Sequence, residues 1–559
     1  MGQTRQQKKI IVVGLDGGSF DVIDPLIQEG RLPNIERLIA NGVRGELEST
    51  TPPVTGPAWA SFMTGKDPGR HGLFDFVKPV ANDWRRKIVS YNDIRAKTLW
   101  SILSENGKDL GVINVPLTYP PPEVRGFLIS GMLTPGTEFQ YTYPAALAKE
   151  IEGRHGPYVL DIWWQNYGPK TIDRFLHDLM ECTRMRERII FDLMDRRRWD
   201  LFMTVFIGTD RIHHALWDYL FPSGRTVVSR AQNQIRGGII AYYELVDDII
   251  GRMAEAVDGR GDLLMMSDHG FGPLRGKVHI NNWLEDLGYL RFDKNRIRKW
   301  KLRKRLMPLL RQLARKGDFL GLRNGLRRRG AKASGRMGAY GFLECIDWSR
   351  TRAYAASNTE QGIYINLVGR EPLGIVEPGE PFDKTRDAII EELKGLRHPK
   401  TDEKLVSRVF KKEDVYPGPY GEEAPDVIFF LKEGEYLADV QPSDDLIQDV
   451  SWKTGSGTHR MKGIFIGHGV DLKKGCCLSG CRIIDICPTI LNLMNVPIPD
   501  DMDGKVLTEA LTDQFLHEFP AQYVASTTDH DSDSREIRGF DSDKEAEHLK
   551  DQLKGLGYM

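Results

Sequence analysis

The short sequence LDGGSFD, residues 15–21, follows the apolar run IIVVG and places an acidic side chain directly after a strand-like pattern. Asp16 ends that pattern, and Gly17 and Gly18 let the chain turn immediately afterwards. An aspartate in this position can cap a helix, belong to a phosphate-binding loop or bind a metal ion. The second acid, Asp21, is expected near the start of the following helix. The stretch alone leaves the three roles of Asp16 open.

A hydroxyl group stands at the start of a second pattern, TGPAWASFMTG, which is typical of a helix. We expect Thr55 in the first turn, where unpaired backbone N–H groups attract an anion. This position suits a nucleophile that attacks a phosphate ester. The alternative is that Thr55 only caps the helix, which is the commoner role of a threonine at such a place.

An acid and a histidine lie four residues apart in the sequence GTDRIHHALWDY. On a helix, Asp210 and His214 share one face and can bind the same ion. The alternative is an aspartate at a helix start with an unrelated surface histidine. His213 points in another direction, so we expect it to pack or to support the site through a hydrogen bond.

Asp268 and His269 are adjacent in MMSDHGFG, and on a straight strand they would face opposite ways. Both reach one site only if the chain turns there, which Gly270 permits. The alternative is an ordinary polar loop after a buried strand. Further along, His459 lies in the Gly/Ser/Thr-rich segment KTGSGTHR, and a histidine in such a loop can adjust to a metal ion. We expect His468, at the end of the strand pattern GIFIGHG, to be structural.

Short apolar runs alternate with longer amphipathic stretches along most of the chain. The runs occupy residues 8–16, 109–116, 200–210, 262–270 and 463–469. This alternation predicts an α/β fold with a mostly parallel sheet sandwiched between helices. In such sheets, ligand sites lie beyond the carboxyl ends of the strands. Candidate ligands that are hundreds of residues apart can therefore meet at one edge of the sheet.

Two regions interrupt the alternation, and we expect both to be insertions that form a cap. Residues 137–200 are helical and rich in Trp, Tyr and Arg, and residues 291–345 are strongly basic. The catalytic core would then consist of residues 1–136, 201–290 and 346–515, followed by an acidic linker and terminal helix at 516–559. The sequence WWQNYGP, residues 163–169, fits equally well a platform that stacks a base or sugar and the packed interior of the cap.

Composition limits the classes of function that the chain can have. The formal net charge of −1 gives no general attraction to nucleic acid, and no window of 18 apolar residues suggests a membrane span. Six cysteines in 559 residues are too few for a disulfide scaffold, so we expect a reducing, cytoplasmic setting. The basic stretch at residues 294–336 either contacts a membrane surface or forms a solvated face of the cap. The oligomeric state stays open.

None of these patterns alone is specific for one protein family, but their order along the chain is. The series resembles the metal ligands and nucleophile of the alkaline phosphatase superfamily, and within it the type I phosphodiesterase/nucleotide pyrophosphatase family. The residues that carry the resemblance are Asp16, Thr55, Asp210, His214, Asp268, His269 and His459. The resemblance covers about residues 8–136, 200–290 and 350–515. It implies the alkaline-phosphatase-like fold.

The resemblance also implies two divalent metal ions at the edge of the sheet. Asp210, His214 and His459 would hold one ion. Asp16, Asp268 and His269 would hold the other, with Thr55 bound beside it. Mixed carboxylate and imidazole ligands favour Zn²⁺, and Mn²⁺ or iron also fits. One ion would activate the Thr55 hydroxyl, and the other would stabilise the leaving oxygen and then activate the water that hydrolyses a phospho-threonine intermediate.

The implied substrate is a small phosphodiester or a nucleotide-type pyrophosphate. The alternatives are a phosphomonoesterase, a phosphonate hydrolase or a phosphoryl mutase on the same core, and a catalytically silent relative that binds anions or membranes. Nucleotide pyrophosphatases carry an asparagine shortly after the HG that follows the nucleophile helix. Residues 71–79, HGLFDFVKP, contain none, and Asn92 and Asn114 are candidate substitutes. The nucleotide preference is therefore open.

Overall fold

A nine-stranded sheet lies at the centre of the computed structural model. The structure describes residues 8–80, 83–221, 229–302, 342–452 and 454–526, and the single residues 306, 545, 548, 549 and 553. Strands β9, β1, β8, β5 and β6 run parallel, whereas β19 runs antiparallel to both of its neighbours. In sheet order the strands are β20 (Cys476–Arg482), β2 (Val43–Glu48), β19 (Lys462–Gly469), β9 (Gly261–Met266), β1 (Lys9–Leu15), β8 (Leu201–Phe206), β5 (Leu110–Val115), β6 (Gly126–Ser130) and β7 (Thr142–Tyr143).

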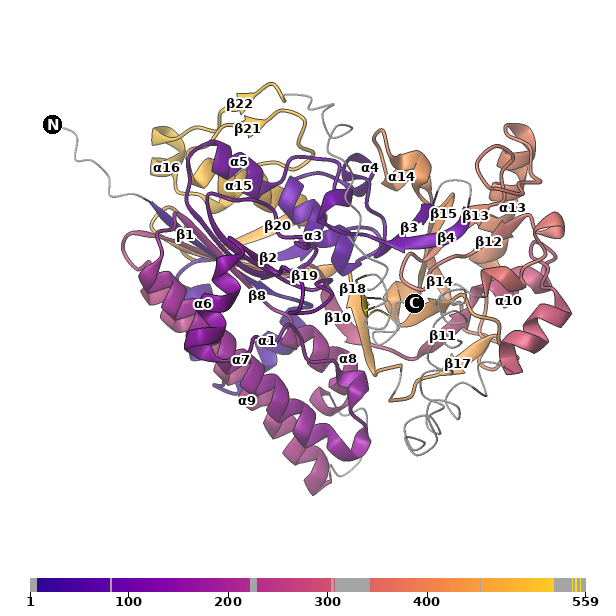
Figure 1. The fold of residues 1–559 in the computed structure, drawn as a ribbon, viewed down its shortest axis with the longest axis horizontal. Coiled ribbons are helices and arrows are strands. Elements are labelled where there is room, and N and C mark those ends of the chain that lie inside the picture. Colours follow the sequence, from indigo (N-terminus) through magenta and orange to yellow (C-terminus); the bar gives the residue numbers. More distant parts are fainter. Residues whose placement is uncertain are drawn as a thin grey trace.

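Both faces of this sheet are covered by helices (Figure 1). In β1, Ile10 and Val12 belong to one hydrophobic cluster, whereas Ile11 and Val13 belong to another, because successive side chains of a strand point to opposite faces. Helices α3 (Thr55–Thr64), α5 (Leu99–Glu105) and α15 (Ile486–Leu493) contribute to the first cluster, and α1 (Phe20–Gln28), α2 (Pro33–Ala40) and α9 (Arg230–Glu255) to the second. This layered arrangement confirms the predicted fold class.

The segment that we expected to form a helical cap, residues 137–200, packs on the sheet instead. It contains α6 (Ala146–His155) and α7 (Ile172–Arg196), and Phe175 and Ile190 of α7 share a hydrophobic cluster with Phe202 of β8. Trp164 is buried in the same cluster, which favours the packing alternative for this residue of WWQNYGP. The segment is hydrophobic enough along one side of α7 to serve as a layer of the core.

A smaller lobe, defined by residues 276–302 and 342–449, has two sheets and a hydrophobic cluster of its own. We expected residues 346–515 in the core, but only their later part adjoins the large sheet, through β18 (Gly457–Arg460), β19, β20 and α15. The lobe contains β11 (Gly276–His279), α10 (Ile280–Asp286), β12 (Ala353–Tyr354), β13 (Gly362–Ile365), α13 (Glu380–Gly395), β14 (Val406–Lys411), α14 (Lys412–Val415), β15 (Val427–Leu431), β16 (Tyr436–Asp439) and β17 (Ile447–Asp449). The exact domain boundaries stay a prediction.

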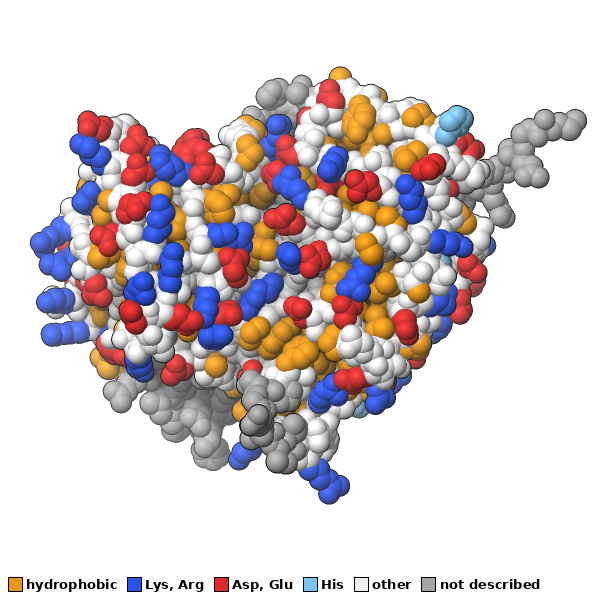
Figure 2. Space-filling view, turned by 180° about the vertical axis from the view of Figure 1, so that it is seen from behind, with side chains coloured by type: hydrophobic (Ala, Val, Ile, Leu, Met, Phe, Trp, Pro, Cys, Tyr) orange, Lys and Arg blue, Asp and Glu red, His pale blue; other side chains and the backbone are white. Residues whose placement is uncertain are grey.

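The surface is mixed in charge. On the face in Figure 2, basic and acidic side chains are interspersed, in keeping with the formal net charge of −1. None of the helices in the described part of the chain is long and apolar enough to cross a membrane. Most of the basic stretch 294–336 lies outside the described residues, so its predicted contact with a membrane surface stays a prediction.

The strand register brings the candidate residues to one edge of the large sheet. Leu15 pairs with Phe206, and Gly14 pairs with Met266, so β1, β8 and β9 end together. Helix α8 (Gly208–Leu220) begins directly after β8. Strand β19 runs the other way and begins at this edge, immediately after β18. Loops from four distant parts of the sequence therefore meet here.

The turn after β1 requires glycine at position 17. Its φ is +65°, and a Cβ there would lie 2.8 Å from the ring of Phe271. Exposed Gly107 has a similar φ of +72°, but a Cβ there would meet nothing within 4 Å. We expect Gly107→Ala to lower the free energy of unfolding by about 1 kcal/mol through backbone strain alone. Gly17→Ala should cost about 1–3 kcal/mol more because of the clash with Phe271. Urea unfolding of both variants measures the difference, and equal losses would contradict it.

Candidate metal centre and active site

Each predicted ligand is positioned by a different element. Asp16 follows β1, and Asp268 and His269 lie in the turn between β9 and β10 (Gly270–Pro273), so the chain bends there as expected. Asp210 and His214 lie one turn apart in α8. His459, which we expected in a loop, belongs to β18 and pairs with Phe271 of β10. Backbone pairing, rather than loop flexibility, fixes its position.

Thr55 begins helix α3, but it does not cap it. Val54 is the N-cap residue and makes no side-chain capping bond. The Thr55 side chain is buried, and its Oγ1 atom lies 3.1 Å from His269 Nε2. The commoner structural role of such a threonine is therefore not the one seen here. Its hydroxyl points to the candidate ligands.

Three histidines turn the same ring nitrogen toward the site. In each, Nδ1 lies within hydrogen-bond distance of a backbone carbonyl: His214 with Gly457 (3.1 Å), His269 with Gly270 (3.0 Å) and His459 with Pro53 (2.8 Å). A carbonyl only accepts, so Nδ1 carries the proton and donates it. The Nε2 atom then presents a lone pair, which is the form of a metal-binding histidine.

The first group of candidate ligands is Asp210, His214 and His459. The Nε2 atoms of the two histidines are 3.1 Å apart, and they lie 3.4 and 3.5 Å from Asp210 Oδ1. Two lone pairs cannot form a hydrogen bond with each other, and Asp210 Oδ1 is buried without a hydrogen-bond partner among the described residues. A cation between these three atoms would satisfy all of them.

The second group, Asp16, Asp268 and His269, has the same character. His269 Nε2 lies 3.2 Å from Asp268 Oδ2 and 3.8 Å from Asp16 Oδ1. Both of these carboxylate oxygens are buried and have no hydrogen-bond partner in the described part of the chain. His269 can also be grouped with Asp210 and His459, and the rings of His269 and His459 stack at 3.5 Å between centroids. The two groups therefore adjoin.

Burial and mutual repulsion dominate the electrostatics of the site. Burial, together with the charges of neighbouring aspartates, raises the pKa of Asp16 and Asp268 well above the usual range. Burial acts in the same direction on Asp210, but His214, His459 and Arg211 together hold its pKa well below the usual range. Burial lowers the pKa of His269 and His459, which favours neutral imidazoles. Three acids and three histidines form a set of ligands that fits a pair of divalent cations.

His213 is the neighbour of a candidate ligand but has no lone pair to offer. Its Nδ1 donates to the Gly17 carbonyl (3.1 Å), and its Nε2 accepts a hydrogen bond from Tyr243 Oη (2.6 Å). Burial lowers the pKa of His213 to about 3, so the ring is neutral. The prediction that His213 packs and supports the site agrees with these contacts.

The sequence patterns did not reveal two side chains that orient the acids. Arg211 is fully buried and donates to Asp210 Oδ2 (2.5 Å) and to Asp161 Oδ2 (2.7 Å). Trp59 Nε1 of α3 donates to Asp16 Oδ2 (3.2 Å). In both acids the bonded oxygen is Oδ2, which leaves Oδ1 for the candidate metal position. The only sign of these two side chains in the sequence was the position of Arg211 directly after Asp210.

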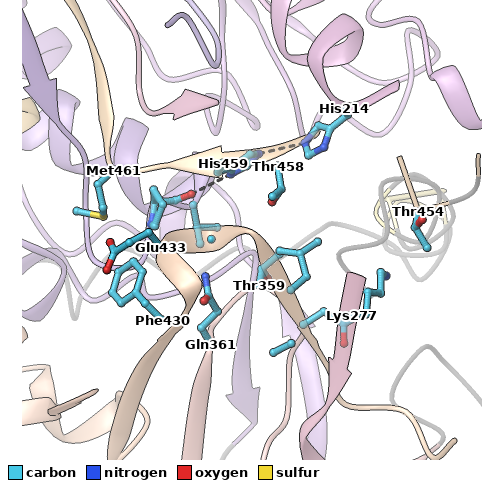
Figure 3. Close-up of a pocket in the computed structure, with 16 residues that line it drawn as sticks. His214, Lys277, Thr359, Gln361, Phe430, Glu433, Thr454, Thr458, His459 and Met461 are labelled. Atoms are coloured by element: carbon cyan, nitrogen blue, oxygen red, sulfur yellow. Dashed lines mark hydrogen bonds between the residues drawn. The ribbon is translucent and has the colours of Figure 1, made fainter. Parts of the chain in front are cut away.

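A pocket opens beside the first group of ligands, between the large sheet and the smaller lobe (Figure 3). His214 and His459 line one side, and Val54 lies next to the Thr55 position. The lobe contributes Lys277 and the segment that contains Asn358, Thr359 and Gln361. Sequence reasoning missed these lobe residues because nothing local in the sequence links them to the ligands.

The candidate asparagine substitutes do not line this pocket. Asn114 lies at β5, where its Oδ1 accepts a hydrogen bond from Tyr158 Oη (2.6 Å). Asn92 lies in a short 3₁₀ turn at Tyr91–Asp93. The amide side chains that do line the pocket are Asn358 and Gln361.

Comparison with known proteins identifies the family. The model of the type I phosphodiesterase / nucleotide pyrophosphatase family matches residues 10–459. The chain belongs to this family. Membership indicates that the protein is a phosphoester hydrolase with a small-molecule phosphoester substrate, and members of the family use divalent metals. No curated protein matches the chain.

Solved structures of other proteins resemble this one at low sequence identity. Phosphonoacetate hydrolase from Sinorhizobium meliloti 1021, in complex with phosphonoformate, is 13% identical, with a TM-score of 0.52 over 88% of this chain and 96% of the other. Murine ectonucleotide pyrophosphatase/phosphodiesterase 5, in an inactive form with AMP, is 14% identical, with a TM-score of 0.48 over 90% of this chain and 100% of the other. The first likeness shows a shared fold.

Adjacent His213 and His214 allow a matched test of the metal centre. We expect His214→Gln to lower the content of bound divalent metal by about one equivalent per chain, because it removes a lone pair from the first group. His213→Gln should keep the metal content of the unaltered protein, since neither ring nitrogen faces the ions. Elemental analysis after dialysis against zinc gives the two values. Equal metal contents in both variants would contradict the assignment of His214.

Proposed function

We propose that the protein is a two-metal phosphodiesterase that acts through a phospho-threonine intermediate at Thr55. The observation that carries the proposal is the placement of the Thr55 hydroxyl, 3.1 Å from His269 Nε2 and at the start of a buried helix. The unpaired carboxylate oxygens and histidine lone pairs beside it support a site for two cations. The same features argue against a catalytically silent relative, because unpaired buried ligand atoms are costly without a use.

The candidate residues have separate roles in the proposed reaction. Asp210, His214 and His459 would hold one cation, and Asp16, Asp268 and His269 the other, with Thr55 beside it. Bound divalent ions, for which we propose Zn²⁺, neutralise the charge that develops on the attacking and leaving oxygens. Trp59 and Arg211 orient Asp16 and Asp210. The first turn of α3 presents backbone N–H groups to a phosphoryl oxygen.

The proposed reaction has two displacements at phosphorus. Thr55 Oγ1 loses its proton and forms a bond to phosphorus, while the bond from phosphorus to the ester oxygen breaks and the alcohol leaves with a proton. Water then forms a bond to phosphorus, and the bond to Thr55 Oγ1 breaks. The threonine hydroxyl is restored, and a phosphomonoester is released.

The nucleophile assignment is tested by two substitutions at one position. Thr55→Ala should lower kcat by at least about 10³-fold, because the attacking oxygen is lost. Metal content and the unfolding midpoint should stay near those of the unaltered protein. Thr55→Ser keeps an oxygen at the same place and should retain measurable turnover. If the alanine variant turned over substrate as fast as the serine variant, Thr55 would not be the nucleophile.

The substrate class is tested with two chromogenic esters. The metal-loaded protein should hydrolyse bis-p-nitrophenyl phosphate with a higher kcat/KM than p-nitrophenyl phosphate. The pocket beside the first ligand group accommodates a second ester substituent, and a monoester leaves it empty. A clear preference for the monoester would instead favour the phosphomonoesterase alternative. Including a phosphonate in the same assay separates the phosphonate hydrolase alternative.

A further inference from the structure

The pocket contains a buried amide oxygen with an unmet hydrogen bond. Gln361 is 6% exposed, and its Oε1 atom is buried without a hydrogen-bond partner among the described residues. Figure 3 shows its amide group directed into the space between Phe430 and Thr359, in the same pocket as His214 and His459. Leaving a buried acceptor unpaired is unfavourable. A ligand that donates a hydrogen bond to it would remove this cost.

The backbone at the same residue is strained. Gln361 has a φ of +44°, in the region that favours glycine, although its neighbour Gly362 is the glycine of this segment. A long side chain rarely adopts this conformation, and such residues are concentrated at ligand sites. The strained backbone and the unpaired amide are independent observations. Both point to Gln361 as a residue that is placed for binding.

Contacts on both sides hold this conformation in place. Thr359 Oγ1 donates to buried Asp75 Oδ1 (2.5 Å), which belongs to the segment after the nucleophile helix. Glu360 accepts a hydrogen bond from Tyr364. A Cβ at Gly362 would lie 2.4 Å from Pro425 Cβ, so the chain there has no freedom to shift. These contacts hold the backbone of the turn that carries Gln361.

The charged groups of the pocket already have partners. Lys277 Nζ lies 3.7 Å from Asp439 Oδ2, and Glu433 accepts a hydrogen bond from Arg408 Nη2 (2.6 Å). The remaining lining is partly apolar and includes Val54, Phe430, Leu437 and Met461. A pocket whose charged groups are paired, whose walls are partly apolar and which contains the unpaired Gln361 acceptor favours a neutral group that carries a hydroxyl.

We propose that Gln361 determines substrate specificity by binding the ester substituent that does not react. This substituent is neutral and carries a hydroxyl group, as in a polyol or sugar ester. This inference rests on the proposed phosphodiesterase function and names the substrate class of that site. Gln361 Oε1 accepts the hydrogen bond, and Phe430 packs against the carbon skeleton.

The test compares pairs of diesters that differ in one hydroxyl. The probes are p-nitrophenyl hydroxyalkyl phosphates and p-nitrophenyl alkyl phosphates of equal chain length, from butyl to hexyl, because shorter hydroxyalkyl chains expel p-nitrophenol by attack of their own hydroxyl on phosphorus. At the length that reaches Gln361, the unaltered protein should prefer the hydroxyalkyl ester by about tenfold in kcat/KM. Gln361→Leu should abolish this preference by raising KM for the hydroxyalkyl ester.

Two further variants separate binding from folding. Gln361→Gly also removes the amide, and it relieves the positive φ, so it should lose the preference even if the leucine variant folds poorly. Gln448→Leu, at an exposed glutamine of β17, should keep the preference. The unfolding midpoint of the metal-free Gln361→Gly variant should not fall, because a strained residue with an unpaired atom has been removed.

The outcomes separate a failure of the proposed role of Gln361 from a failure of the proposed phosphodiesterase function. If Gln361→Leu and Gln361→Gly retain the tenfold preference, or if the unaltered protein shows none at any chain length, the role of Gln361 is wrong while the diesterase function stands. If the metal-loaded protein hydrolyses none of the diesters, the phosphodiesterase function itself fails, and the inference with it.

Discussion

Uncompensated negative charge at the carboxyl edge of the large sheet is the constraint on which the rest of the structure depends. Asp16, Asp210 and Asp268 are each 1% exposed and lie close enough to repel one another. Arg211 pairs with one of them, and Trp59 donates to another. Burial of several carboxylates is strongly unfavourable unless cations or hydrogen bonds compensate for it. The histidines between them turn Nε2 toward the site, so the site is built for added cations.

The fold keeps these groups together by fixing the backbone around them. Four of the ligands follow the ends of adjacent strands or lie in the turn between β9 and β10, whose places are set by sheet register. His214 and His459 are oriented by carbonyls from other segments, such as the bond of His459 to Pro53 just before the nucleophile helix. Asp16 is held in the same way by Trp59 of that helix. These three ligands are therefore held by neighbours that are distant in sequence. Loss of one segment would disturb the orientation of ligands on another.

The smaller lobe forms one side of the pocket beside the candidate metal centre and gives that pocket its chemical preferences. Its connection to the core includes Asp75, which follows the nucleophile helix and binds Thr359 of the lobe. Buried Arg86 of β4 (Asp83–Ile88) adds a second link through Glu360 (3.6 Å). These links join the element that carries Thr55 to the turn that carries Gln361. The reactive hydroxyl and the side chain proposed to select the substrate are thus held in one framework.

The sequence by itself determined the α/β class, the family resemblance and the seven candidate residues, because strand runs, turn glycines and ligand types are local features. It did not determine which segments cover the sheet: residues 137–200 pack on it, and residues 276–302 and 342–449 form a second lobe. Those outcomes depend on which hydrophobic faces meet, and such pairings are set by contacts between distant residues. Only the tertiary structure placed Arg211 behind Asp210 and Gln361 beside His459, because orientation and unmet hydrogen bonds arise when separate segments are brought together.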